Sequence, residues 1–413
     1  MMLPKLHINV LALASAQAVN FLIPILILPY MTRVLGASSY GQVVFVQSIM
    51  QIFWVLIDFG YTWSATRDVS SVRHQKEKVS QIFFSVWSVQ WGIFLLIVLS
   101  SLIMHLLHPN FFENWQYFYA GLGIILGQLL FPLWFYNGLE QFKVIAILQV
   151  LGKVTALPII FLCVRDVNNI VGAILYFSIA SLISGVFAIA WIVRSGMIIW
   201  CRSTKADIIN SLKSASWIFA SRISISSYTS AVPLVIGIVC GPTQLAYFSL
   251  ADKVRAALQA MIEPVSQALL PRMSYLIFHD RSAAALLLNK AALFVSGVTL
   301  FTGLVVFTYS NSLVHLLAGD EFMDAGNVLS WLAFVPLVVV GSNLIGVQVM
   351  IPLGMNREFA TIITAAALIS CLGLYPLIEA WGAVGAAVLI LIVESVISLS
   401  LVTYFINKKI YTL

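Results

Sequence analysis

Twelve stretches of mostly apolar residues follow one another along this chain, separated by short polar segments. A helix needs about 20 such residues to cross the hydrocarbon core of a membrane. Several of the separating segments are rich in Gly, Asn, Asp and Ser, as at 36–39 and 165–169, which is typical of tight turns. The pattern therefore predicts an all-α polytopic membrane protein with twelve transmembrane helices, at 8–33, 41–63, 81–107, 116–136, 144–164, 170–193, 215–240, 244–270, 290–317, 327–351, 359–378 and 383–406.

Basic residues occupy the gaps between these stretches very unevenly. Sixteen Lys and Arg residues lie in the N-terminal segment, the C-terminal segment and the gaps after every second stretch. Only Arg33 and Arg165 lie on the other side, and four more within stretches complete the total of 22 (16 + 2 + 4). Cytoplasmic loops of membrane proteins carry such an excess of positive charge. We therefore expect a multi-pass protein with both termini in the cytoplasm.

Composition agrees with a membrane protein and excludes other classes. Of 413 residues, 61% are hydrophobic and 9% are charged, whereas soluble domains carry about 25% charged residues. The net charge of +6 would suggest a nucleic-acid partner in a soluble protein. Here the cytoplasmic gaps account for most of it, so we expect no nucleic-acid partner. The longest cytoplasmic gap, about 194–214, is too short for a separate soluble domain.

A repeat relates the two halves of the chain. A shift of 205 residues superimposes a turn glycine, a small residue, an acid and an arginine, namely Gly36 on Gly241, Gly41 on Ala246, Asp58 on Glu263 and Arg67 on Arg272. Parallel repeats in transporters are related by an axis along the membrane normal, and the substrate path lies between the halves. We predict two six-helix lobes related by such a pseudo-two-fold, at 1–193 and 215–413, joined by a cytoplasmic linker at 194–214.

Ionisable residues within the apolar stretches are the candidates for function. At bilayer depth each costs at least about 2.5 kcal/mol unless it faces a partner or a water-filled cavity. They are Asp58, Lys153, Arg222, Asp252, Lys253, Arg255 and Glu263, with Glu379 and Glu394 in or near the last two stretches.

Helix geometry separates the charges around residue 252. Asp252 and Arg255, three positions apart, share a helix face and are predicted to pair. Lys253 points about 100° away from Asp252. Structural roles are the alternatives to a functional role for these charges. Asp252 and Arg255 would form an ion pair that fixes packing, Lys253 and Arg222 would snorkel to the surface, and Asp58 and Glu263 would neutralise nearby bases. Lys153 lies near the middle of its stretch, which favours a water-filled cavity.

Motifs for enzyme chemistry are missing from the sequence. There is no phosphate-binding loop of the form G-x-x-x-x-G-K-[ST] and no H-E-x-x-H pair. The four cysteines are far apart, with no metal-ligand spacing. We therefore expect a transporter without a cofactor or a metal, rather than an enzyme.

Four segments resemble one known family, the Wzx-type polysaccharide flippases. The most specific is PYMTRVLG at 29–36, followed by Tyr40-Gly41; the others are DFG at 58–60 with SATRDV at 64–69, GLEQF at 138–142 and YFSLADK at 247–253. The resemblance implies a member of the multidrug/oligosaccharidyl-lipid/polysaccharide exporter superfamily, with two six-helix lobes around a central cavity.

The same resemblance implies a function and partners. The protein would flip undecaprenyl-diphosphate-linked oligosaccharide, as in O-antigen assembly, from the cytoplasmic to the periplasmic leaflet of the bacterial inner membrane. It implies alternating access, coupling to H⁺ or Na⁺, contact with membrane lipids, and cooperation with polysaccharide polymerase and chain-length machinery.

A diphosphate needs compensating positive charge to cross a low-dielectric region, and arginine can bind phosphate through two hydrogen bonds. We predict that the diphosphate or an acidic sugar is bound by a set of cations: Lys153, Arg222 and Lys253, then Arg255, with Arg33 near the outer mouth. Arg67 and Arg272 are predicted at the cytoplasmic mouth. Asp58, Asp252 and Glu263 are the candidates for ion coupling.

Four other classes remain as alternatives. A multidrug or cation antiporter of the same superfamily would use Asp58 and Glu263. A major-facilitator transporter would carry a glycine-containing motif after the second stretch, which is absent here. A membrane sugar transferase or acyltransferase would need an active site facing water. Lipid II flippases are similar but typically have two more membrane spans.

Overall fold

The computed structural model describes residues 3–109, 114–260 and 262–408, and the regular elements in these ranges are helices. The chain divides into two compact units. Unit 1 comprises Met1–Ile27 and Phe45–Ser226, and unit 2 comprises Leu28–Val44 and Ser227–Leu413. The first and last helices are long and bent: α1 spans Leu3–Asp58 and α16 spans Asn356–Asn407.

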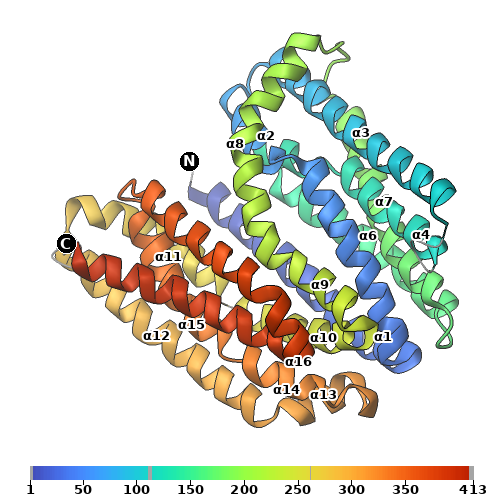
Figure 1. The fold of residues 1–413 in the computed structure, drawn as a ribbon. Coiled ribbons are helices and arrows are strands. Elements are labelled where there is room, and N and C mark those ends of the chain that lie inside the picture. The colour runs from blue at the N-terminus through green and yellow to red at the C-terminus, as the bar shows by residue number, and fades with distance from the viewer. Residues whose placement is uncertain (1–2, 110–113, 261, 409–413) are drawn as a thin grey trace. The chain divides into compact units, whose positions relative to one another are not determined.

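The other helices of unit 1 are α2 (Tyr61–Ser71), α3 (Lys76–Leu107), α4 (Trp115–Leu130), α5 (Leu133–Gly138), α6 (Phe142–Cys163), α7 (Ile170–Arg194) and α8 (Lys205–Thr229), whose last three residues belong to unit 2. Helices α4, α6 and α7 lie side by side (Figure 1). Small residues let these helices approach closely, as is common in membrane helix packing. Ser178 and Ser181 of α7 donate hydrogen bonds to the Ala120 and Ile124 carbonyls of α4, at 2.5 and 2.9 Å.

An aromatic core fixes the other side of unit 1. Phe83 of α3 lies 5.8 Å from the Trp134 ring and 5.1 Å from the Phe135 ring, centroid to centroid, and all three side chains are buried. Edge-to-face aromatic pairs add about 0.5–1.5 kcal/mol beyond their burial. This core holds α5 and, through α5, the neighbouring α2 in place.

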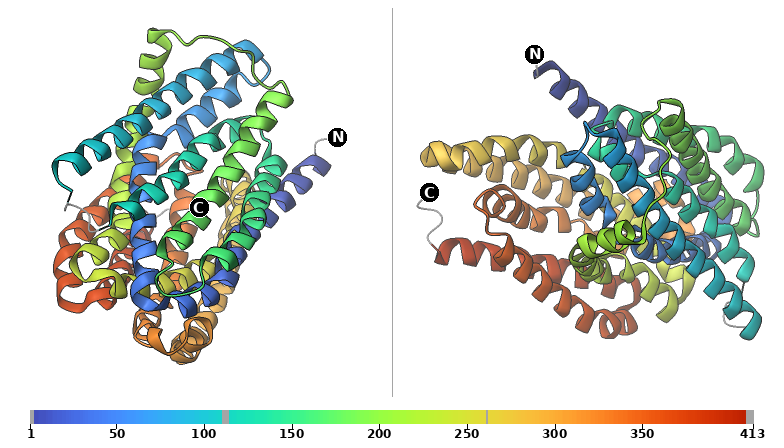
Figure 2. Two further views of the ribbon diagram at one scale, coloured as in Figure 1. Left: turned by 90° about the vertical axis from the view of Figure 1, so that its right-hand side faces the viewer. Right: turned by 90° about the horizontal axis from the view of Figure 1, so that it is seen from above.

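Unit 2 contains α9 (Ala231–Val239), α10 (Gly241–Ala260), α11 (Glu263–His279), α12 (Arg281–Thr308), α13 (Ser310–Ala318), the 3₁₀ turn η1 (Asp320–Phe322), α14 (Ala325–Leu332), α15 (Val335–Ser342), the π-helix η2 (Asn343–Met350) and α16. Helix α15 packs against both α12 and α16 (Figure 2). Helix α10 contacts α9, α14 and α16.

Two glycines bend the longest helices. Gly36 has φ 70° within α1, and Gly382 has φ 57° within α16, values that glycine adopts without steric cost. A Cβ at Gly36 would lie 2.6 Å from a carboxylate oxygen of Glu321, so that side chain would have to move. Because of these bends, α1 and α16 each cover two of the predicted apolar stretches.

Eight helices among the described residues are long and apolar enough to cross a membrane. This confirms an all-α, polytopic membrane fold. The predicted stretches 215–240 and 244–270 contain no candidate span. Asp252, Lys253 and Arg255 lie close together in the second, and α8, which covers part of the first, is rich in serine. The number of twelve spans therefore stays a prediction.

The compact units differ from the predicted lobes in two places. Residues 28–44 belong to unit 2, because Arg33, Ala37 and Tyr40 form hydrogen bonds with residues of that unit. The whole predicted linker 194–214, and residues 215–226 of the predicted C-terminal lobe, belong to unit 1, where α8 begins at Lys205. The lobes 1–193 and 215–413, and their pseudo-two-fold, stay a prediction.

Local breaks agree with the sequence repeat. Asp58 ends α1 just before a break and α2, which contains Arg67. At the same shift of 205 residues, Glu263 begins α11, which contains Arg272. The turn glycines Gly36 and Gly241 both have positive φ, at 70° and 82°. Each of the two acids therefore lies next to a helix break, although the helix boundaries themselves do not superimpose at this shift.

Candidate functional site

Two predicted site residues of unit 1, Asp58 and Arg67, lie near the point where α1 ends and α2 begins. Phe59 and Gly60 have φ 45° and 76°, which turns the chain between the helices. Asp58 is only 2% exposed and accepts two hydrogen bonds from Thr62, one from the backbone amide at 3.1 Å and one from the hydroxyl at 2.5 Å. A carboxylate in this position caps a helix and is favoured by the positive end of its dipole.

Helix α8 brings a predicted cation to this break. Phe219 stacks on Phe59 with 4.2 Å between ring centroids. A Cβ at Gly60 would lie 2.9 Å from the Phe219 amide nitrogen, so glycine permits this approach. Arg222 lies over the Trp63 ring, with its guanidinium carbon 5.7 Å from the ring centroid, and its charge acts on Asp58. The structure thus places two predicted site residues, Asp58 and Arg222, within electrostatic range.

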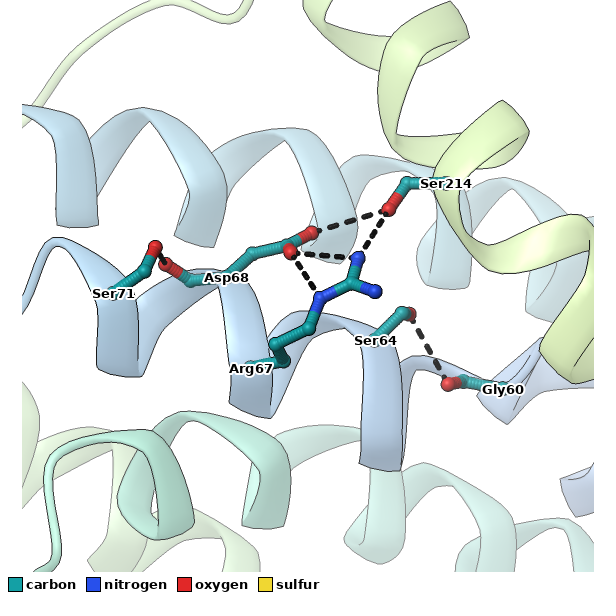
Figure 3. Close-up of polar contacts among 6 residues, drawn as sticks. All are labelled: Gly60, Ser64, Arg67, Asp68, Ser71 and Ser214. Carbon is teal, nitrogen blue, oxygen red and sulfur yellow. Dashed lines mark hydrogen bonds and ion pairs between the residues drawn. The ribbon is translucent and has the colours of Figure 1, made fainter. Parts of the chain in front are cut away.

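Arg67, predicted at the cytoplasmic mouth, already has partners (Figure 3). Its Nε and Nη2 atoms donate to Asp68 Oδ1 at 3.0 and 2.9 Å, and Nη2 also donates to Ser214 Oγ at 3.1 Å. Ser214 donates to the other Asp68 oxygen at 3.3 Å. Arg67 is 65% exposed, and exposed ion pairs contribute little stability. This arginine can therefore exchange partners at small cost.

A cavity of about 410 Å³ lies beside this ion pair, within unit 1. Residues of α2, α3 and α8 line it, including Asp68, Lys78, Asp207 and Asn210. The predicted substrate cations Lys153 and Arg222 are not among its lining residues. The cavity therefore does not coincide with the predicted diphosphate site.

Lys153 lies on α6, and its side chain is partly buried. A Cβ on the preceding residue, Gly152, would come 2.6 Å from the Ala180 carbonyl oxygen of α7. Helices α6 and α7 are therefore in close contact at Gly152. Lys153 is the one basic residue of α6 beyond its first turn.

The second group of charges lies on α10, in unit 2. Arg255 Nε donates to Asp252 Oδ1 at 2.7 Å, and Arg255 Nη1 donates to Gln259 Oε1 at 2.7 Å. The side chains of Arg255 and Asp252 are 20% and 33% exposed. The ion pair predicted from the spacing is confirmed.

Lys253 points elsewhere, as predicted. Its ammonium group donates a hydrogen bond to the Tyr40 hydroxyl and lies 5.0 Å from the centroid of the same ring. Tyr40 is 1% exposed and meets Phe322 edge to face at 6.1 Å. Phe322 in turn meets Tyr247 of α10 at 6.0 Å. The tyrosine that contacts the lysine therefore belongs to a cluster of three aromatic side chains.

Arg33 and its neighbours tie α1 to the α13–η1 turn of unit 2. Arg33 Nη2 donates to the Leu316 carbonyl at 2.8 Å, and the Ala37 amide donates to Glu321 Oε2 at 3.0 Å. The bend at Gly36 exposes that amide, because the helix is interrupted there. Arg33 therefore binds the C-terminal turn of α13, and this bond orients its side chain without any ligand.

The remaining predicted residues lie on α11. Glu263 begins this helix, and its side chain lies outside the described residues. Arg272 is exposed. The predicted cations thus fall into two groups, with Lys153 and Arg222 in unit 1 and Arg33, Lys253 and Arg255 in unit 2.

Two features were not among the predicted site residues. Glu394 of α16 is a partly exposed acid within a long apolar helix. A buried polar cluster joins the π-helix to α11: Ser266 donates to Asn343 Oδ1 at 2.7 Å, and Gln348 Nε2 donates to the Ser266 carbonyl at 3.0 Å. A polar residue inside an apolar stretch was the only sequence signal for either feature.

These observations define a class: a multi-pass α-helical membrane protein with cations partly buried in its apolar helices. Residues 6–277 match the family described as polysaccharide biosynthesis protein. The chain belongs to this family.

Two curated proteins and several solved structures are similar to the chain. An Escherichia coli K12 protein and a Shigella dysenteriae protein, both described as "Putative O-antigen transporter", are each 28% identical, over 98% and 95% of this chain and 98% of each relative. A lipid II flippase MurJ structure has a TM-score of 0.75 at 16% identity, covering 97% of this chain and 87% of that one. A multidrug resistance MATE transporter structure has a TM-score of 0.67 at 12% identity, covering 95% and 98%.

The predicted resemblance to Wzx-type flippases is confirmed by the family match and these relatives. The predicted class of transporter rather than enzyme agrees with the same proteins. The antiporter alternative is not favoured, because the relatives that cover nearly the whole chain carry O-antigen names.

Proposed function

We propose that this protein flips lipid-linked oligosaccharide units from one leaflet of a membrane to the other for the assembly of a surface polysaccharide such as O-antigen. The observation that carries the proposal is the family match over residues 6–277, together with relatives of matching length described as O-antigen transporters. The substrate is an undecaprenyl-diphosphate-linked oligosaccharide, and the membrane is the bacterial inner membrane with both termini of the protein in the cytoplasm.

The architecture proposed for this task has twelve transmembrane helices in two six-helix lobes that alternate in access. Bends such as those at Gly36 and Gly382 supply places where long helices can change direction. Contact with membrane lipids follows from the exposed apolar side chains on α3, α12 and α16. The polysaccharide polymerase and chain-length machinery are proposed as downstream partners.

The diphosphate is the part of the substrate whose charge the protein must compensate, because a charge in low-dielectric surroundings costs several kcal/mol or more without compensation. We assign this compensation to Lys153, Arg222, Lys253 and Arg255, with Arg33 assisting release. Lys253 has a tyrosine hydroxyl as its partner rather than a carboxylate. It can therefore bind a phosphate without breaking an ion pair.

Arg67 and Arg272 are proposed to attract the anionic headgroup at the cytoplasmic mouth. Both are exposed, as such a role requires. For ion coupling we retain Asp58, Asp252 and Glu263 as candidates, with H⁺ or Na⁺ as the ion. Among them, Asp252 accepts a hydrogen bond from Arg255, which is one of the proposed substrate-binding residues.

A deletion strain tests the proposal. Loss of the gene should abolish surface polysaccharide while the lipid-linked precursor accumulates in the cytoplasmic leaflet, and the wild-type gene should restore export. Lys253→Met and Arg255→Met should fail to restore it at normal protein level. Arg73→Met is the matched control, because Arg73 pairs with Glu140 in an exposed ion pair and belongs to none of the proposed sites. Unchanged polysaccharide in the deletion strain would refute the function.

A further inference from the structure

The cavity beside the Arg67–Asp68 pair combines apolar and polar lining residues. Its volume of about 410 Å³ is within the range of about 300–1,000 Å³ that is usual for small-ligand sites. Buried residues of its wall include Tyr61, Ala65 and Val86. All of its exposed lining residues are polar, namely Ser71, Lys78, Gln81 and Asn210. A ligand that fits this cavity therefore needs both hydrogen-bonding groups and apolar surface.

Three of the exposed side chains have hydrogen-bonding groups available to a ligand. The Lys78 ammonium and the side-chain amides of Gln81 and Asn210 form no hydrogen bond with other described residues. An amide group both donates and accepts, whereas an ammonium group only donates. A hydroxyl group also donates and accepts, so these side chains can bind hydroxyl groups of a ligand in either direction.

The charges around the cavity balance each other. Asp68 and Asp207 contribute two negative charges to the lining, and Lys78 contributes one positive charge. Arg67, bonded to Asp68 at 2.9 Å, adds a second positive charge at the edge. An anionic ligand inside the cavity would face both carboxylates, and a cationic ligand would face both bases. This balance favours a neutral molecule with several hydroxyl groups.

Two exposed indole side chains lie beside the segments of α3 and α8 that line the cavity. Trp200 meets Phe84 of α3 edge to face at 4.9 Å, and Phe84 is next to the lining residue Ser85. Trp217 follows the lining residue Ser214 by three positions on α8, and both indoles are 85% exposed. Tryptophan is enriched at the interface between membrane and water. This position indicates that the cavity lies at headgroup level, where the sugar of a glycolipid also lies.

We propose that this cavity binds the neutral sugar that is attached to the diphosphate of the lipid-linked oligosaccharide, as the substrate enters from the cytoplasmic leaflet. The inference rests on the proposed function and gives the sugar a site of its own. Arg67 exchanges Asp68 and Ser214 (Figure 3) for the diphosphate at the edge of the cavity. Asp68 then becomes an acceptor for a sugar hydroxyl. The order of cation and cavity matches the order of diphosphate and sugar in the substrate.

Binding to the purified full-length protein in detergent separates the sugar from the diphosphate. The probes are a short-chain prenyl diphosphate and the same lipid carrying one glucose, galactose or N-acetylglucosamine, and titration calorimetry gives each Kd. Wild type should bind at least one sugar-bearing lipid about tenfold more tightly than the bare diphosphate, which is the effect of one or two hydrogen bonds. Equal Kd values would overturn the proposal. Absence of binding to every prenyl diphosphate would overturn the proposed function, and this inference with it.

Variants show whether the preference for sugar comes from the cavity. Gln81→Leu and Asn210→Leu should each reduce it, and the double variant should abolish it. Arg67→Met should weaken binding of the bare and the sugar-bearing lipid by the same factor. Gln75→Leu is the matched control, because Gln75 is exposed, does not cap α3 with its side chain and does not line the cavity. A preference that survives in the double variant, at an unchanged unfolding midpoint, would overturn the proposal.

A second measurement locates the sugar without an affinity value. Full-length protein in vesicles is irradiated with the same lipid carrying a diazirine on its sugar, and mass spectrometry identifies the labelled peptides. Label should lie within residues 61–86 and 207–214, and an excess of the lipid without diazirine should prevent labelling. Label confined to other segments would exclude this cavity as the sugar site.

Discussion

The acids Asp58, at the α1–α2 break, and Asp252, on α10, differ in the partners that stabilise them. Asp58 is buried, accepts two hydrogen bonds from Thr62 and caps α2. Asp252 is 33% exposed and accepts a hydrogen bond from Arg255 at 2.7 Å. Asp58 thus has neutral donors within its own helix turn, whereas Asp252 depends on a cation that we assign to the diphosphate. We therefore propose that Asp58 mainly fixes the start of α2 and that Asp252 is the acid whose partner can change.

The largest expected effect follows from removing the shared cation. Arg255→Ala leaves Asp252 without its cation, and breaking a buried pair in this way costs about 3–5 kcal/mol. Because Arg255 and Asp252 are partly exposed, we expect the lower end of that range. Thermal unfolding in detergent should show a markedly lower midpoint, and the double variant Asp252→Ala/Arg255→Ala should recover part of it. An unchanged midpoint in the single variant would show that the pair contributes nothing.

The next largest effect separates the two acids. Asp58→Ala removes a helix cap and should cost about 1–2 kcal/mol, whereas Asp58→Asn keeps an acceptor for the Thr62 amide and should cost little. Export by Asp58→Asn should also continue with normal dependence on the pH gradient. If Asp58→Asn folds normally but loses that dependence, then Asp58 is the coupling acid and the comparison is wrong.

A smaller effect concerns the partner of Lys253. Tyr40→Phe removes the hydroxyl that accepts the lysine's hydrogen bond but keeps the ring beneath it, and should cost about 0.5–1.5 kcal/mol. Polysaccharide export should persist, because the lysine remains available for the diphosphate. Export by Tyr40→Phe is measured beside Lys253→Met, which should fail. If Lys253→Met exports polysaccharide as well as Tyr40→Phe does, Lys253 does not belong to the binding set.

The smallest effect lies outside the membrane-spanning segments and serves as a baseline. Thr204 and Asp207 form a capping box at the start of α8, with the Thr204 amide donating to Asp207 Oδ2 at 2.9 Å and the Asp207 amide donating to Thr204 Oγ1 at 3.2 Å. Thr204→Ala should cost about 0.5–1 kcal/mol and leave export unchanged. Loss of export at normal stability would show that the α8 N-terminus has a direct role.

The pH dependence of this cap has a definite sign. The bonds from Thr204 hold the pKa of Asp207 below its usual value. Because the folded-state pKa is the lower one, the contribution is fully present above the unfolded value of about 3.9 and is lost as the pH falls through the folded value. Wild type and Thr204→Ala should therefore converge in unfolding midpoint toward low pH. A constant difference between them would contradict this origin.

Local features of the structure could be predicted from the sequence. The Asp252–Arg255 pair and the different direction of the Lys253 side chain follow from helix periodicity alone. Positive φ at Gly36 and Gly241, and the helix breaks next to Asp58 and Glu263, agree with the repeat at 205 residues. These features depend on residues close together in the chain, so spacing and residue type are enough.

Partners that are distant in the chain could not be predicted. Tyr40 with Lys253 and Trp63 with Arg222 meet only through helix packing, and apolar stretches carry little information about which faces touch. The stretches 215–240 and 244–270 were predicted as spans, but they contain no candidate span among the described residues, because their serines and charges lower the mean hydropathy.

The role of the buried cations in moving a diphosphate is tested most directly by comparing two lipids in vesicles that contain the full-length protein. One lipid carries a sugar on a polyprenyl diphosphate, and the other carries the same sugar on a polyprenol without phosphate. Wild type should flip the diphosphate lipid much faster, and Lys253→Met with Arg255→Met should lose this preference. Equal rates for the two lipids with wild type, or a preference that survives both substitutions, would contradict the account.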